Sequence, residues 1–195
     1  MKKVLLIGDS IRMGYDHYVR EKLEGQAEVL FPVENCQFAM HVLWYIVDWK
    51  DSYQWGDDVD LVHWNAGLWD ILHVLGEEEA FTPPEQYRDL LGRIAKRIRR
   101  LFPKAKIVFA LSTPVQEEKY SSEYYRKNAE IRQYNDIARE VFAGTDVVIN
   151  DLYSVMENVP AEYYSDPTHF YTPEGTERTG NAVLNCICPL LDLPI

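Results

Sequence analysis

The sequence predicts an α/β protein, built as a three-layer α/β/α sandwich around a five-stranded, mainly parallel central sheet. Short apolar runs recur along the chain, longer segments with helical spacing of apolar residues separate them, and polar segments follow the ends of several runs. The helices that connect parallel strands cover both faces of the sheet, so its strands can be apolar on both sides.

Five short apolar runs are predicted as strands. Gly8 ends the first run and Pro32 ends the second, because glycine and proline interrupt regular structure. The remaining three are bounded by Asn65, by Thr113-Pro114 and by a polar stretch. The predicted strands span residues 3–7, 28–31, 60–64, 106–111 and 147–149.

Five longer segments are predicted as helices, because apolar residues recur in them at intervals of three and four. Gly25 suits the end of the first helix, Pro84 the first turn of the third and Gly144 the end of the fourth. The predicted helices span residues 11–24, 37–49, 84–100, 121–143 and 173–191.

The size and charge of the chain limit what it can be. Its 195 residues are predicted to form one domain, residues 1–195. Its 20 basic and 31 acidic residues give a net charge of −11, which disfavours nucleic acids and anionic membranes as partners. The oligomeric state is left open.

No targeting or metal pattern is found in the sequence. Only four aliphatic residues follow Met1-Lys2-Lys3, which is too few for a secretory signal, so a cytoplasmic location is expected. No apolar run approaches the roughly 18–20 residues of a membrane span. Cys36, Cys186 and Cys188 fit neither a zinc pattern nor a disulfide framework, so free thiols are predicted and no metal or organic cofactor is expected.

Gly8-Asp9-Ser10 follows the first predicted strand, where ligands bind in open parallel sheets. A serine at this turn can expose its hydroxyl at the cleft, and its backbone N–H can face a developing oxyanion. Capping of the following helix by Asp9 or Ser10 is an equal alternative. A phosphate-binding loop is a weaker one, because neither common glycine-rich phosphate motif is present.

A serine nucleophile needs a base, and the base needs an orienting carboxylate. Three histidines follow an aspartate at a spacing of three, so position must separate them. Asp60 and His63 lie in the predicted strand 60–64, where residues three apart point to opposite faces. They therefore cannot form a dyad, and His63 is predicted to be a core histidine. The pair Asp70–His73 could share a helical face and is a serious rival to the pair Asp166–His169, which lies before the last helix.

The order of these motifs resembles the SGNH hydrolase superfamily, also called GDSL esterases and lipases. Gly8-Asp9-Ser10 resembles its first block, Asp166-Pro167-Thr168-His169 its last, and residues 128–140 its penultimate helix. The resemblance covers nearly the whole chain and implies a flavodoxin-like sheet. It implies that Ser10 is the nucleophile, His169 the general base and Asp166 the residue that orients His169.

The middle blocks of that family fit the chain less well. The family pairs the N–H of the serine with a glycine N–H of its second block and an asparagine side chain of its third. Here the second block has no glycine, and a tryptophan stands where the asparagine is expected. The candidate oxyanion donors are therefore Ser10, Ala39, Met40, Asn65 and Trp69, and the candidate pocket residues are Asp9, Asn35, Gly67 and Phe170.

The resemblance implies a serine esterase that hydrolyses small acyl esters, most simply acetyl groups on carbohydrates. The lack of a long apolar lid segment favours a short acyl group. A lipase or thioesterase of the same fold is an alternative, as is a glycan-binding or acyl-transferase variant. Aromatic residues that could stack on sugars or line an acyl pocket are Trp44, Trp69, Tyr120, Tyr124, Tyr163, Tyr164, Phe170 and Tyr171.

Overall fold

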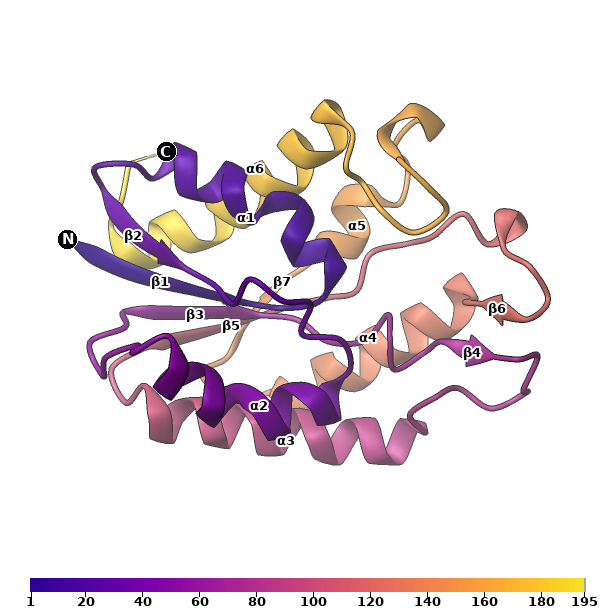
Figure 1. Ribbon diagram of the computed structural model, residues 1–195, viewed down its shortest axis with the longest axis horizontal. Coiled ribbons are helices and arrows are strands. Elements are labelled where there is room, and N and C mark those ends of the chain that lie inside the picture. The colour runs from indigo at the N-terminus through magenta and orange to yellow at the C-terminus, as the bar shows by residue number, and fades with distance from the viewer. Residues whose placement is uncertain (195) are drawn as a thin grey trace.

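The computed structural model describes residues 1–194 and contains the predicted five-stranded sheet (Figure 1). Its strands all run parallel, in the order β2-β1-β3-β5-β7. This confirms the predicted sheet, and each strand lies within two residues of the predicted run. The strands are β1 (Lys2–Ile7), β2 (Ala27–Leu30), β3 (Leu61–Trp64), β5 (Lys106–Ala110) and β7 (Val148–Asn150).

Helices cover both faces of this sheet, as the prediction of three layers requires. One face carries α1 (Ser10–Lys22), α5 (Leu152–Met156) and α6 (Pro173–Leu191) (Figure 1). The opposite face carries α2 (Ala39–Ser52), α3 (Pro84–Leu101) and α4 (Asn128–Phe142). The short helix α5 was not predicted.

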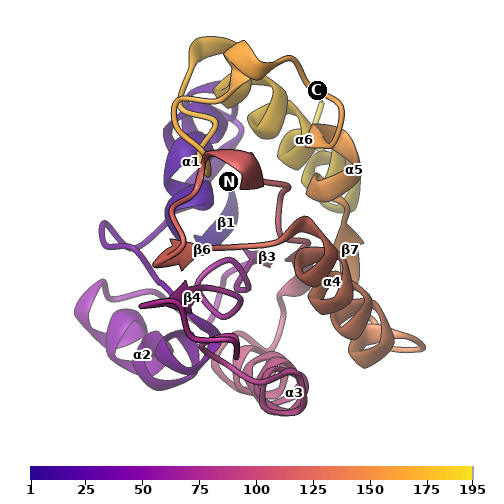
Figure 2. The ribbon, with the colours of Figure 1, turned by 90° about the vertical axis from the view of Figure 1, so that its right-hand side faces the viewer.

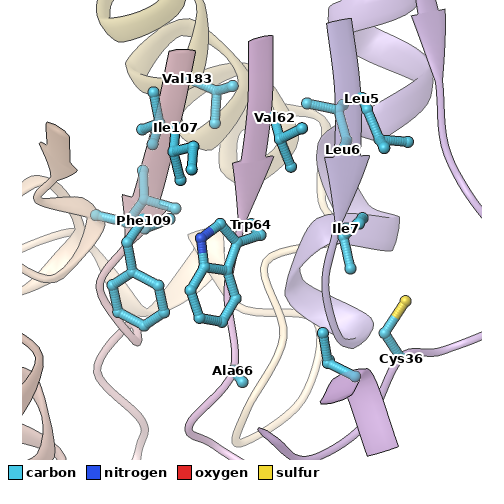
Figure 3. Close-up of a cluster of buried hydrophobic side chains, with 14 of the residues drawn as sticks. Leu5, Leu6, Ile7, Cys36, Val62, Trp64, Ala66, Ile107, Phe109 and Val183 are labelled. Carbon is cyan, nitrogen blue, oxygen red and sulfur yellow. The ribbon is translucent and has the colours of Figure 1, made fainter. Parts of the chain in front are cut away.

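The core consists of apolar side chains that leave the sheet on both faces (Figure 3). Leu5, Leu6 and Val62 of the central strands are fully buried. Trp64 and Phe109 pack edge to face, with ring centroids 4.7 Å apart. These strands end at the same edge of the sheet, so the core gives the residues that follow them a rigid support.

The segment before α4 differs from the prediction. A helix was predicted over 121–143, but α4 begins only at Asn128. Within the missing part, β6 (Tyr124–Tyr125) pairs antiparallel with β4 (His73–Val74), and the rings of His73 and Tyr125 stack 4.4 Å apart. Both strands lie in front of the carboxyl ends of the central strands (Figure 2). Their two-residue length is too short for any hydrophobic period to be recognised.

The predictions about membrane spans and cysteines can be compared with the structure. Within residues 1–194, no helix is both long and apolar enough to cross a membrane. The three cysteines are free thiols, and Cys36 and Cys188 are buried.

Candidate active site

Ser10 is the first residue of α1 and directly follows the turn that ends β1. The carboxylate of Asp9 accepts a hydrogen bond from the Ile11 N–H at 2.9 Å, so Asp9 caps the helix. The hydroxyl of Ser10 is therefore not used for capping. Its backbone N–H lies in the first turn of the helix, where N–H groups have no partner within the helix.

Gly8 allows the turn to approach the neighbouring strand closely. A Cβ atom at this position would lie 1.9 Å from the side-chain oxygen of Asn65, which no side chain can tolerate. The side-chain amide of Asn65 in turn donates to the Asp9 carboxylate at 3.0 Å. The glycine thus permits a contact that fixes the orientation of Asp9, one residue before Ser10.

Ser10, His169 and Asp166 form a continuous hydrogen-bonded series. The Ser10 Oγ lies 2.7 Å from His169 Nε2, and His169 Nδ1 lies 2.7 Å from Asp166 Oδ2. Ser10 and His169 are 159 positions apart in the sequence. The His169 side chain is 23% exposed and that of Asp166 44% exposed, so the series is open to solvent. The structure thus brings together the three residues that the sequence analysis selected.

The loop before α6 is shaped by Asp166. Its Oδ1 accepts hydrogen bonds from the backbone N–H groups of Thr168 at 2.8 Å and His169 at 2.9 Å. Partial burial raises the pKa of Asp166, but these hydrogen bonds and the His169 ring outweigh burial and lower the pKa below its ordinary value. The carboxylate is therefore ionised at neutral pH, with its second oxygen directed at His169.

Tyr171 joins this loop to the start of α1. Its hydroxyl donates to the Ser10 carbonyl at 2.6 Å, and its ring stacks on His169 with centroids 4.7 Å apart. The ring also lies against Gly14, where a Cβ atom would approach it to 2.8 Å. From the sequence, Tyr171 was a candidate only for sugar stacking or an acyl pocket. Its contacts instead indicate that it holds the His169 ring next to Ser10.

The two other Asp-x-x-His pairs do not form dyads. His63 is fully buried, and its Nε2 lies 3.1 Å from the Asn150 amide, as expected for a core histidine. His73 was the rival base, but its Nε2 lies 2.8 Å from Glu130, and Asp70 contacts a different segment. Residues 71–72 are not helical, so the shared helical face expected for Asp70 and His73 does not exist.

One of the candidate oxyanion donors, the Ala39 N–H, already has a hydrogen-bond acceptor, and three others keep a free N–H in the part of the chain that the structure describes. The Ala39 N–H donates to Asp70 at 3.0 Å, so it is already bound. Met40 lies in the first turn of α2, where its N–H has no partner within the helix. Asn65 has a second amide hydrogen besides the one given to Asp9. The Trp69 indole N–H has no hydrogen-bond partner within residues 1–194.

Two carboxylates are buried behind this edge of the sheet. Asp9 and Asp70 are both 0% exposed. Burial raises the pKa of Asp70 to about 7, although hydrogen bonds from Thr82 and the Ala39 N–H oppose it. Burial likewise raises the pKa of Asp9, against hydrogen bonds from Asn65 and Ile11. From the sequence, the only role considered for Asp70 was the dyad with His73, which does not form.

The candidate pocket residues differ in their contacts: one shapes a loop, one is a buried ring and one is a glycine close to another segment. Asn35 accepts a hydrogen bond from the Gln37 N–H at 2.8 Å and so shapes its own loop. Phe170 is buried and packs against the ring of Tyr164, with centroids 4.2 Å apart. Gly67 has a φ of +155°, and a Cβ atom there would lie 2.1 Å from the Ser112 hydroxyl. Among the predicted aromatic residues, Trp44 lies on α2 and is 68% exposed.

Within residues 1–194, no group of three or more histidine, cysteine, aspartate or glutamate side chains is arranged to hold a metal ion. A hydroxyl, an imidazole and a carboxylate in this order are the parts of a nucleophile activated by a general base.

Several solved structures with the same fold are named as lipases, acylhydrolases or esterases. A lipase/acylhydrolase from Enterococcus faecalis matches at 19% identity over 97% of both chains, with a TM-score of 0.75. An acetyl xylan esterase matches at 15% identity over 95% of this chain and 99% of its own, with a TM-score of 0.74. A GDSL-like lipase from Bacteroides thetaiotaomicron matches at 18% identity over 97% of this chain and 89% of its own, with a TM-score of 0.73.

The same fold is thus present over nearly the whole chain, in spite of the low identity. Neither the comparison with protein-family models nor the comparison with curated proteins gives a match.

Proposed function

We propose that this chain, which has the fold of the GDSL lipases and acylhydrolases, is a serine hydrolase of the SGNH type that cleaves carboxylic esters. The observation that carries the proposal is the 2.7 Å separation of Ser10 Oγ from His169 Nε2, with Asp166 on the other ring nitrogen. The fold comparison supports the same reaction class, since the matching structures are named as esterases, lipases and acylhydrolases.

The reaction proceeds through an acyl-enzyme. His169 Nε2 takes the proton of the Ser10 hydroxyl as the oxygen attacks the ester carbonyl. The tetrahedral intermediate collapses when His169 returns that proton to the leaving alkoxide. Water, activated by the same nitrogen, then attacks the acyl-enzyme and releases the acid. Asp166 keeps the proton of the neutral ring on Nδ1 and stabilises the imidazolium that forms in each step.

The developing oxyanion requires donors near Ser10. The Ser10 N–H is the first, because the positive end of α1 also favours negative charge there. The second amide hydrogen of Asn65 is the next candidate, since the bond to Asp9 fixes the orientation of this amide. The Met40 N–H and the Trp69 indole complete the set of available donors. Ala39 is left out because its N–H is bound by Asp70.

The substrate proposed first is a small acyl ester, with an acetyl group on a carbohydrate as the simplest case. The exposure of His169 and Asp166 supports a shallow site rather than an enclosed channel for a long acyl chain. One of the matching structures is named as an acetyl xylan esterase. Turnover of 4-nitrophenyl acetate should therefore exceed that of 4-nitrophenyl octanoate and of acyl-coenzyme A.

Covalent labelling tests the reaction class without knowledge of the substrate. A fluorophosphonate should modify the protein once, and peptide mass spectrometry should place the adduct on Ser10. Ser10→Ala should remove both labelling and turnover, because the acyl-enzyme cannot form. Ser154→Ala is the matched control, since the Ser154 hydroxyl donates to Asp151 and has no contact with a histidine in residues 1–194. Failure to label the folded protein would instead favour a binding function.

A further inference from the structure

Arg126 is a buried arginine at the carboxyl-end face of the sheet. It follows β6 directly and is only 8% exposed. Its Nε donates to the Leu68 carbonyl, and its Nη1 lies 3.4 Å from the Tyr120 hydroxyl. The guanidinium also lies 6.0 Å from the centroid of the Tyr120 ring. The side chain is therefore held in one place by two separate loops.

Arg126 makes no direct ion pair with a carboxylate in residues 1–194, although its charge acts on the buried Asp9 and partly opposes the rise that burial causes in the pKa of that carboxyl. The other buried arginine, Arg12, forms an ion pair with Asp16, whereas Arg126 forms none within residues 1–194. Its Nη2 has no hydrogen-bond partner in the same range. An arginine remains charged at any ordinary pH, and burying an unpaired charge is costly. An anion from outside the chain would offset that cost.

The contacts of Arg126 place it beside the proposed reaction centre. Leu68 belongs to the segment after β3 that also carries Asn65 and Trp69. The Tyr120 hydroxyl lies 2.6 Å from that of Thr168, the residue before His169. The strand β6, which precedes Arg126, lies in front of the carboxyl ends of the central strands (Figure 2). Both loops that Arg126 joins thus reach the triad region.

Arg126 also borders a cavity. The cavity has a volume of about 340 Å³, and Tyr120, Tyr125 and the hydroxyls of Ser121 and Ser122 line it with Arg126. Glu117, Glu118 and Lys127 line it too, but all three are exposed, so solvent screens their charges. The buried guanidinium is screened much less. An anionic group that enters this cavity therefore interacts most strongly with Arg126.

We propose that Arg126 binds a carboxylate or phosphate group of the ester substrate, so that the enzyme prefers esters with a negative charge near the scissile bond. This inference rests on the proposed esterase function and adds a substrate class to it. Arginine suits the role because its planar fork of donors matches the oxygens of both groups.

The test compares esters that differ only in charge. The acetyl esters 3-acetoxybenzoate and 3-acetoxybenzamide have nearly the same shape, and 3-acetoxyphenyl phosphate distinguishes phosphate from carboxylate. We expect the wild type to prefer at least one of the two anionic esters to the amide. Arg126→Gln should lower kcat/KM for the preferred anion about 10- to 100-fold, the range of a charge-assisted hydrogen bond, and for the amide much less.

Two further variants make the result specific. Arg132→Gln removes the same charge from an exposed residue of α4 that donates only to the Tyr153 hydroxyl, and it should leave the preference unchanged. Arg126→Lys keeps the charge but loses the fork, and it should keep part of the preference. If the wild type does not distinguish charged from neutral esters, or if Arg126→Gln slows all three equally, the inference is wrong.

Fluorophosphonate labelling separates this failure from a failure of the proposed function. Labelling of Ser10 in the wild type and in Arg126→Gln, together with no charge preference, would reject only the role of Arg126. No labelling of the wild type would reject the esterase function on which that role depends.

Discussion

Asp166 uses both of its carboxylate oxygens, and they do different things. One oxygen accepts two backbone N–H groups and shapes the loop, while the other accepts from the His169 ring. A substitution that keeps the first function and changes the second can therefore separate folding of the loop from chemistry. Asparagine does this, because its amide oxygen can still accept both backbone hydrogen bonds.

Asp166→Asn should lower kcat on 4-nitrophenyl acetate about 100-fold with little change in thermal stability. The amide nitrogen would donate to Nδ1 and select the ring tautomer that cannot accept the Ser10 proton. Kinetics and thermal unfolding on the same preparation measure both effects. An unchanged kcat would mean that Asp166 does not orient His169.

Gly8→Ala should inactivate and destabilise the protein although glycine carries no reactive group. The added Cβ would lie 1.9 Å from the Asn65 oxygen, so the strand end or the amide must move. Either movement displaces Asp9 and Ser10. Gly92→Ala is the control, because a Cβ atom there meets nothing within 4 Å. If Gly8→Ala had the activity and melting temperature of the wild type, the close approach would not matter.

Sequence reasoning reached some residues of the site and not others, for a physical reason. Ser10, Asp166 and His169 lie in short motifs that follow strand ends, and the fold brings such ends together. Arg126 carries no motif, since its burial depends on contacts with Leu68 and Tyr120 from other loops. The replacement of Asn by Trp in the third block signals an altered site, but it does not indicate which donors remain.

At the scale of elements, α2 begins without a cap from its own segment. Its N-cap residue is Phe38, which has no side-chain acceptor, and Asp70 supplies the acceptor from another part of the chain. The carboxylate therefore joins the segment after β3 to the N-terminus of α2. The helix dipole favours this charge, but burial opposes it and raises the pKa of Asp70 to about 7.

Asp70→Asn should change how stability depends on pH. In the unfolded chain the Asp70 carboxyl has an ordinary pKa of about 3.9. Between about pH 4 and 7 the folded protein therefore holds a proton that the unfolded chain has lost, and the wild type loses stability as the pH rises. The slope from one such group is at most about 1.4 kcal/mol per pH unit.

Urea unfolding of both proteins from pH 5.5 to 7.5 measures this effect. The free energy of unfolding of Asp70→Asn relative to the wild type should rise across the window, because asparagine does not titrate. Asp9 is also buried, and its charge adds to burial in raising the pKa of Asp70, so the difference between the two curves includes the coupling of these two carboxyls. Parallel pH curves would mean that Asp70 does not titrate in this range.

The elements that sequence reasoning missed are the short ones. The five strands were found from their apolar runs and the five long helices from apolar residues at helical intervals, although one helix was given the wrong start. β4 and β6 contain two residues each, and the rings of His73 and Tyr125 stack across the pair. Such pairing depends on tertiary contacts, which the local sequence does not reveal. The helix predicted over 121–143 therefore includes β6 and begins seven residues before the observed start of α4 at Asn128.

At the scale of the whole molecule, the alternation of strands and helices determines the layers but not the order of strands. The order β2-β1-β3-β5-β7 places β1 and β3 next to each other, so the turn after β1 meets the segment after β3. This adjacency explains why Asn65 contacts Asp9. Layers of apolar strands and helices tolerate much substitution, so this chain can share the fold of the lipase/acylhydrolase from Enterococcus faecalis at 19% identity.

The hydrogen bond between Ser10 and His169 has a consequence for the course of folding. It joins residues 159 positions apart, whereas most helices can form from neighbouring residues alone. After dilution from urea, far-ultraviolet circular dichroism should recover in an earlier phase than turnover of 4-nitrophenyl acetate. Recovery of turnover would then report the moment at which His169 reaches Ser10. Simultaneous recovery of both signals would show that these two residues meet as early as the helices form.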